Sequence, residues 1–120
     1  MASPSSPGII TVKSVDASGN NPVVQTDSWA STQKSVVTPG AAVQCPSLEA
    51  PAGMGIVFLA KPGNTGEIYL GNSKANAENA AVRVELGASN AVILKVSNAN
   101  LVWVDAETAN EGICIFVEQS

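Results

Sequence analysis

The sequence predicts an all-β protein, a small antiparallel β-sandwich or barrel with an extended N-terminal arm. Short runs of four to eight residues rich in Val and Ile recur along the chain, and clusters of Gly, Pro, Asn and Ser separate them. Runs of this length are typical of strands, because helices need about 10 to 12 residues with a 3.6-residue period. A chain of 120 residues can bury one self-sufficient core. A jelly-roll-like order of the strands is compatible with this pattern.

Residues 1–8 have the composition of an arm rather than of a core element. They hold Pro4, Pro7, and four Ser or Gly residues, which favours an extended and flexible segment. They carry no positive charge and no long apolar block, so no secretory signal is expected. We therefore expect an N-terminal arm over 1–8 and a single β domain over 9–120.

Within that domain the pattern predicts strands of similar length from one end to the other. The runs are Ile9–Val15, Val23–Thr26, Ser35–Thr38, Ala42–Cys45, Gly55–Ala60, Glu67–Leu70, Ala81–Leu86, Ala91–Val96, Leu101–Asp105 and Ile113–Glu118. The segment Lys74–Ala81 contains four Ala but is too short for a stable helix. We expect a loop there, with at most one helical turn.

The turn residues indicate how these strands are connected. Pro and Gly in Lys61–Gly66 are typical of a reversing turn and predict a hairpin between its flanking strands. Short loops also separate the runs 82–86, 92–96 and 101–105, which predicts an antiparallel meander.

Two of the strands also show which faces they bury. Val82, Val84 and Leu86 alternate with charged residues, which indicates one buried and one solvated face. Gly55–Ala60 has no polar residue on either face. We therefore expect it in the middle of a sheet, covered on both sides.

The composition excludes several classes of function. The formal charge is −4 and only 13% of the residues are charged, so binding to nucleic acid is not expected. No apolar run approaches the roughly 20 residues of a membrane span. Without His, neither a Ser-His-Asp nor a Cys-His site can be built from one chain. No phosphate-binding glycine loop is present, and we expect a non-enzymatic protein without cofactor or metal.

The remaining candidate groups have structural and functional interpretations. Asp105, Glu107 and Glu111 could gather oxygens around Ca²⁺, but the segment lacks the ligand pattern of a calcium loop, which favours a solvated acidic loop. Cys45 and Cys114 are 69 positions apart (114 − 45), far from a metal-type spacing. A disulfide between them is conceivable, but free buried thiols are favoured because no secretory signal is expected.

Five aromatic residues are present, and Trp29 is the one that lies in a polar stretch. It is a candidate interface anchor, core residue or ring platform for a sugar. Trp103 alternates with valines and is expected in the core or at a subunit contact. The few long charged side chains leave a surface that another protein can cover at modest desolvation cost. Pro4, Pro7, Ile9, Trp29 and Trp103 are the candidate interface residues.

The C-terminal half resembles the small β domains of tailed-bacteriophage virion proteins, among them head decoration (cement) proteins. The segments that carry the resemblance are Glu67–Ser73, Val84–Gly87, Val92–Val96, Asn100–Ala106 and Gly112–Glu118. The resemblance implies a structural role on the exterior of the virion, made in the host cytoplasm and bound to a major capsid protein as a homo-oligomer, with a trimer favoured. A carbohydrate-binding β module of a phage tail or receptor-recognition component is the alternative.

Overall fold

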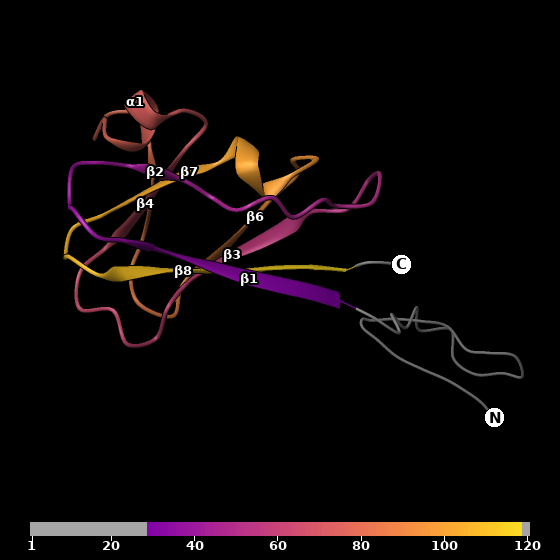
Figure 1. Ribbon diagram of the computed structural model, residues 1–120, viewed down its shortest axis with the longest axis horizontal. Helices are drawn as coiled ribbons and strands as arrows, with labels where there is room; N and C mark the ends of the chain where they lie inside the picture. Colours follow the sequence, from indigo (N-terminus) through magenta and orange to yellow (C-terminus); the bar gives the residue numbers. More distant parts are fainter. Residues whose placement is uncertain (1–28, 119–120) are drawn as a thin grey trace, which may run out of the picture. The chain divides into compact units, whose positions relative to one another are not determined.

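The computed structural model describes residues 29–118 (Figure 1). Residues 30–117 form one compact unit, while Trp29 and Glu118 belong to a second unit that otherwise lies outside the described residues. The elements are β1 (Trp29–Val36), β2 (Val43–Gln44), β3 (Ile56–Ala60), β4 (Ile68–Gly71), α1 (Lys74–Ala77), β5 (Val84–Leu86), β6 (Ala91–Leu94), the 3₁₀ turn η1 (Ala99–Leu101), β7 (Trp103–Ala106) and β8 (Glu111–Glu118). The predicted arm and the first two predicted strands fall outside this range.

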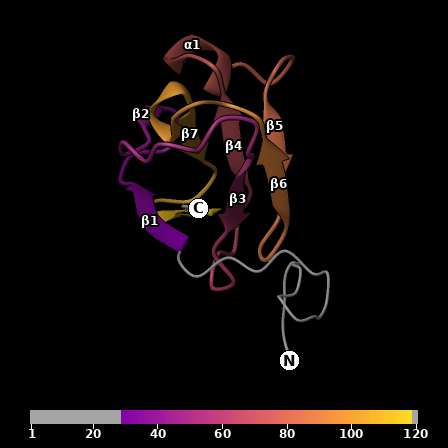
Figure 2. The same cartoon turned by 90° about the vertical axis from the view of Figure 1, so that its right-hand side faces the viewer.

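The eight strands form two packed antiparallel sheets, which confirms the all-β sandwich. The first sheet has the order β1-β8-β3-β6, and the second has the order β2-β7-β4-β5 (Figures 1 and 2). The edge strands β5 and β6 belong to different sheets and lie on the same side of the sandwich (Figure 2). This pairing order separates many strands that are neighbours along the chain.

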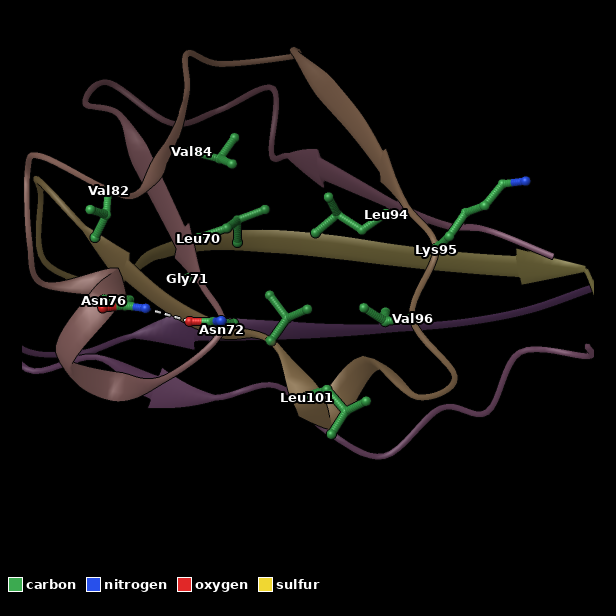
Figure 3. A pocket seen from close by; sticks show the side chains of 11 residues that line it. Leu70, Gly71, Asn72, Asn76, Val82, Val84, Leu94, Lys95, Val96 and Leu101 are labelled. Carbon is green, nitrogen blue, oxygen red and sulfur yellow. Dashed lines mark hydrogen bonds between the residues drawn. The ribbon is translucent and has the colours of Figure 1, made fainter. Parts of the chain in front are cut away.

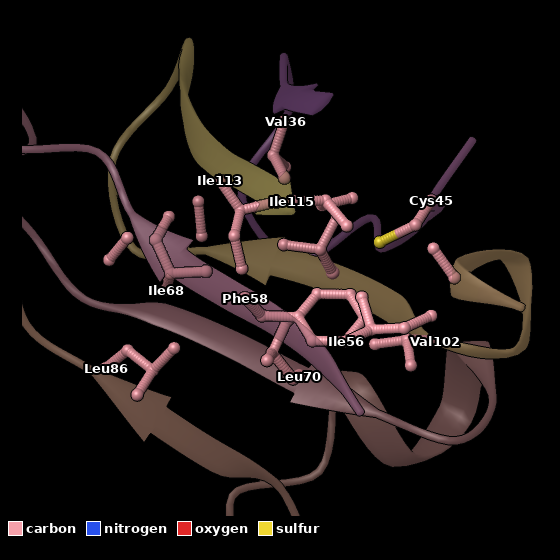
Figure 4. Close-up of a cluster of buried hydrophobic side chains, with 14 of the residues drawn as sticks. Val36, Cys45, Ile56, Phe58, Ile68, Leu70, Leu86, Val102, Ile113 and Ile115 are labelled. Atoms are coloured by element: carbon pink, nitrogen blue, oxygen red, sulfur yellow. The ribbon is translucent and has the colours of Figure 1, made fainter. Parts of the chain in front are cut away.

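The core lies between the sheets and follows from the two-residue period of the strands. In β3, Ile56, Phe58 and Ala60 are fully buried and alternate with half-buried residues. Ile68 and Leu70 of β4 meet them from the second sheet (Figure 4). Strand β3 lies between β8 and β6, so its predicted central position is confirmed. The expected cover on both sides is not complete, because Val57 and Leu59 on its other face are only half-buried.

The predicted hairpin and the predicted meander are both wrong. A turn does occupy residues 61–66, but β3 before it pairs with β6 and β8, while β4 after it pairs with β5 and β7. The turn thus connects the two sheets. Likewise β5 and β7 both pair with β4, whereas β6 pairs with β3. A short loop between two successive strands therefore does not mean that these two strands pair with each other in this fold.

Several strand boundaries also differ from expectation, and those of β1 and β5 differ most. β1 begins at Trp29, well before the predicted Ser35, because its polar residues occupy the outer positions of an edge strand. β5 contains only Val84–Leu86, since residues 80–82 form a turn. Val82 is 58% exposed and Val84 is 37% exposed, so the expectation that both are buried is wrong.

The segment after β4 forms a single helical turn, as expected. Ser73 is its N-cap, and the Ser73 hydroxyl accepts a hydrogen bond from the backbone N–H of Asn76 at 3.1 Å. The turn packs on β4 and β7, with Ala77 fully buried. A Cβ at Gly71 would overlap the backbone nitrogen of Ala77, so only glycine allows this close approach.

Candidate functional site

The outer face of the first sheet is unusually apolar. Val57 and Leu59 of β3 alternate with the core residues and point to this face, as do Cys114 and Phe116 of β8; all four side chains are half-buried. Antiparallel sheets commonly alternate apolar inner residues with polar outer ones. Here neither central strand places a polar side chain between those residues on the outer face. The polar residues of this face lie at its margins, at Ser31, Gln33 and Ser35 of β1 and at Glu118 at the end of β8.

Strand β6 extends this face to the opposite edge. Ile93 lies opposite Val57 in the pairing with β3 and is 65% exposed. A Cβ at Gly55 would lie only 2.5 Å from Cγ2 of Ile93 and 3.9 Å from Cγ of Lys95. The missing side chain at Gly55 therefore gives Ile93 room to lie across the sheet. We call Val57, Leu59, Ile93, Cys114 and Phe116 the outer apolar face.

An open groove lies between the sheets on the side where β5 and β6 form their edges (Figure 3). Its volume is about 430 Å³, and Leu70, Val82, Val84, Leu94, Val96 and Leu101 line most of it. Asn72, Asn76 and Lys95 supply polar atoms around these side chains. Val82, Val84, Ile93 and Leu101 account for four of the six large apolar side chains that are exposed among the described residues. This side of the sandwich is therefore apolar, and we call the groove that lies there the edge groove.

The outer face of the second sheet is covered differently. Asp105 is buried, with 3% of its surface exposed, and its Oδ1 accepts hydrogen bonds from the backbone N–H groups of Gly40 (2.9 Å) and Ala106 (2.8 Å). Tyr69 of β4 lies opposite Asp105 in the pairing with β7, and the guanidinium of Arg83 lies 3.4 Å from the centre of the Tyr69 ring. The loop around Gly40, the helical turn α1 and Arg83 thus occupy much of this face.

The acidic residues 105–111 act as acceptors for backbone groups. Glu107 accepts a hydrogen bond from the N–H of Glu67 at 3.1 Å. Glu111 accepts three, from the N–H and hydroxyl of Thr65 and from the N–H of Gly66, at 2.7 to 2.9 Å. Among residues 29–118, no group of three or more His, Cys, Asp or Glu is arranged to hold a metal ion. The acidic segment fastens the 65–67 loop.

Protonating Glu111 is expected to loosen this loop. Hydrogen bonds from the N–H groups of Gly66 and Thr65 lower the pKa of Glu111. The pKa of Glu78 is also lowered, first by a hydrogen bond from the Lys74 ammonium and second by one from the backbone N–H of Ala42. The stabilisation is present above the ordinary carboxyl value of 4.5 and is lost as the pH falls through the lower folded-state values. The midpoint temperature of thermal unfolding should therefore decrease as the pH is lowered from about 5 to about 3.

Glu111→Gln tests this assignment, with Glu85→Gln as a control, because the Glu85 carboxylate pairs with the Arg83 side chain at 3.2 Å rather than with the 65–67 loop. The Glu111 variant should have a lower midpoint at pH 7 and a shallower decline in acid, because the charged acceptor is already gone. Differential scanning fluorimetry from pH 7 to pH 3 measures both. An unchanged acid slope would contradict the role of Glu111.

Both cysteines are free thiols. Cys45 lies in the core, and burial raises the pKa of its thiol to about 12, with Lys34 opposing the shift. Cys114 is half-buried on the outer apolar face. The expectation of free buried thiols agrees with the structure at Cys45, whereas Cys114 is partly accessible.

Of the five predicted interface residues, the structure describes Trp29 and Trp103, which lie on different sheets. Trp29 is the first residue of β1 and is 62% exposed. Trp103 is the first residue of β7 in the second sheet, half-buried between Gln44 and Gly71 on the neighbouring strands. Pro4, Pro7 and Ile9 lie outside the described residues. Sequence reasoning did not select Ile93, Leu101 or Val82, although the lack of polar residues on Gly55–Ala60 already indicated that its outer face needs a cover.

No known protein family matches the chain, and no curated protein or solved structure is significantly similar to it. In residues 29–118, no helix is long and apolar enough to cross a membrane. The fold and these surfaces thus define the protein as a small β-sandwich with an apolar outer face.

Proposed function

We propose that this chain is a non-enzymatic structural protein of a phage virion, which binds the outside of the capsid and reinforces it. The β-sandwich fold supports this proposal, together with the resemblance of residues 67–73, 100–106 and 112–118 to virion accessory proteins. The partner would be the major capsid protein, and the protein would be made in the host cytoplasm and located on the capsid exterior. Neither nucleic acid nor a membrane is needed for this role.

The outer apolar face is the observation that carries the proposal. Val57, Leu59 and Ile93 share one surface of β3 and β6, and apolar contacts of this kind contribute about 25 cal/mol per Å² buried. The low proportion of charged residues keeps the desolvation cost of covering such a surface small. An accessory protein can therefore bind a shell without a charged patch.

Binding to capsids that lack the protein tests the proposal directly. The purified chain should co-sediment with such capsids and saturate, and the decorated shells should resist heat or chelator treatment better. Leu59→Glu places a charge in the outer apolar face and should weaken binding at least tenfold, about 1.4 kcal/mol. Val37→Glu, at a side chain that is 68% exposed in the loop after β1, is the matched control. Absent or unsaturable binding of a folded wild-type protein would refute the proposal.

The exposed ring of Trp29 favours a second candidate, a carbohydrate-binding module. Aromatic faces commonly stack on sugars, and Trp29 is 62% exposed. Tyr69 is a poorer platform, because Arg83 lies over its ring at 3.4 Å. A glycan array with the wild-type chain and Trp29→Ala separates the two functions: hits that the substitution abolishes support the module, and an array without hits removes it.

A further inference from the structure

Strand β6 is an edge strand whose four residues carry none of the usual protection against pairing, and its nearest lysine, Lys95, follows its last residue. It is the last strand of the first sheet in the described part of the chain, and it reads Ala91-Val-Ile-Leu94 with neither a charge nor a proline. Natural sheets commonly protect their edges with lysines, prolines, bulges or covering loops. Here the side chain nearest the middle of the edge is Ile93, which is 65% exposed.

The backbone hydrogen bonds show which groups of β6 remain available at this edge. The carbonyl of Asn90 accepts a hydrogen bond from the N–H of Ala60 at 2.9 Å, so the Asn90 carbonyl is directed toward β3, while the Asn90 N–H donates to the carbonyl of Gly87 in the preceding turn. Successive residues of an antiparallel strand direct these groups to alternate sides. Val92 and Leu94 therefore also face β3, and the N–H and C=O groups of Ala91 and Ile93 point away from it.

We infer that a second copy of this chain pairs with β6 across a two-fold axis through Ile93, so that the two first sheets join into one. In this antiparallel register, Ile93 lies opposite Ile93 of the second copy, and Ala91 lies opposite Lys95. Each of these residues has the outward backbone orientation that a ladder requires. The side chains of Ile93 then meet on the same face of the joined sheet, which an antiparallel pair demands.

Charge and shape are both compatible with this register. The two Lys95 residues lie four positions apart along the strands, roughly 13 Å, and each faces the small side chain of Ala91. The edge groove opens on the same side as β6, so the two grooves face one another beneath the new ladder. Val82 and Val84, which are exposed in the single chain, are then shielded from water. This pairing does not depend on capsid binding, and it predicts a dimer where the resemblance implies a trimer.

Light scattering coupled to size exclusion tests the stoichiometry. The wild-type chain should approach twice its mass of 12.2 kDa as its concentration rises. Ile93→Lys sets two ammonium groups opposite each other and should weaken the dimer at least 100-fold. Val37→Lys adds the same charge at a site 68% exposed and distant from β6, and it should leave the dimer intact. A wild-type monomer or trimer, a dimer that Ile93→Lys leaves intact, or equal losses in both variants would overturn the inference.

Cross-linking tests the register independently. In a Cys114→Ser background, Ile93→Cys should form a disulfide-linked dimer on mild oxidation, because directly opposite residues lie about 5.5 Å apart between Cα atoms. Ala91→Cys should not, since its counterpart is offset by roughly 13 Å. Cross-linking of Ala91→Cys in preference to Ile93→Cys would refute the two-fold axis through Ile93. Capsid sedimentation can succeed or fail without changing either result, so the two proposals fail separately.

Discussion

Replacing Phe58 with alanine is expected to lower the free energy of unfolding by about 3 to 5 kcal/mol, the usual range for a fully buried ring. Phe58 is fully buried on the central strand β3 and belongs to the cluster that both sheets form (Figure 4). The loss combines the transfer of the ring to water with the cavity that rigid neighbouring strands cannot fill. Because a domain has only about 5 to 15 kcal/mol of stability, the variant should lose a large fraction of its stability and unfold at a clearly lower urea concentration.

Urea unfolding followed by tryptophan fluorescence measures this loss. Phe58→Leu keeps most of the volume and should cost less than about 1.5 kcal/mol, so the difference between the variants isolates the cavity. The dependence on urea should be the same for all three proteins. A loss below about 1 kcal/mol for Phe58→Ala would mean that the ring is not central to the core.

The second large effect is expected at Gly71, where alanine should cost about 1 to 3 kcal/mol. A Cβ there would overlap the backbone of Asn76 and Ala77, which cannot move as a flexible side chain can. The helical turn α1 would have to lift from β4, and the buried Ala77 would be exposed. Gly71 thus couples the end of β4 to the cover of the second sheet.

Gly63→Ala is the matched control for this substitution. An added Cβ at Gly63 would have no heavy atom within 4 Å, so its effect should stay within about 0.5 kcal/mol. The same urea titration compares the two variants. Equal stabilities of Gly71→Ala and Gly63→Ala would show that α1 does not pack closely on Gly71.

The sequence predicted the class of fold and the position of its most apolar strand, since these depend on local pattern. Gly55–Ala60 carries no polar side chain, and only a central strand can bury so much of it. The partners of the strands were not predictable in the same way. Pro62 and Gly63 fix a reversal of the chain, but the energy that chooses between pairing and crossing to the other sheet comes from packing of residues far away in sequence.

The candidate surfaces were predictable only in outline. The low charge indicated a surface suited to protein contacts, and two tryptophans were selected as its anchors. In the structure Trp29 is exposed, and further exposed apolar side chains gather at Val82, Val84, Ile93 and Leu101. Val82 and Val84 have the alternation of a buried face, but Val82 lies in the turn at residues 80–82 and Val84 lies on β5, an edge strand in the described part of the chain.

The position of β8 has a consequence for biosynthesis. This strand, the last in the described chain, lies between β1 and β3 in the middle of the first sheet. A ribosome must therefore release residues 111–118 from its exit tunnel before β1 can join the sheet. Until then β3 lacks one neighbour, and a nascent chain exposes its apolar segments to chaperones. Folding of the first sheet is accordingly expected to proceed at a rate limited by contacts between distant parts of the chain.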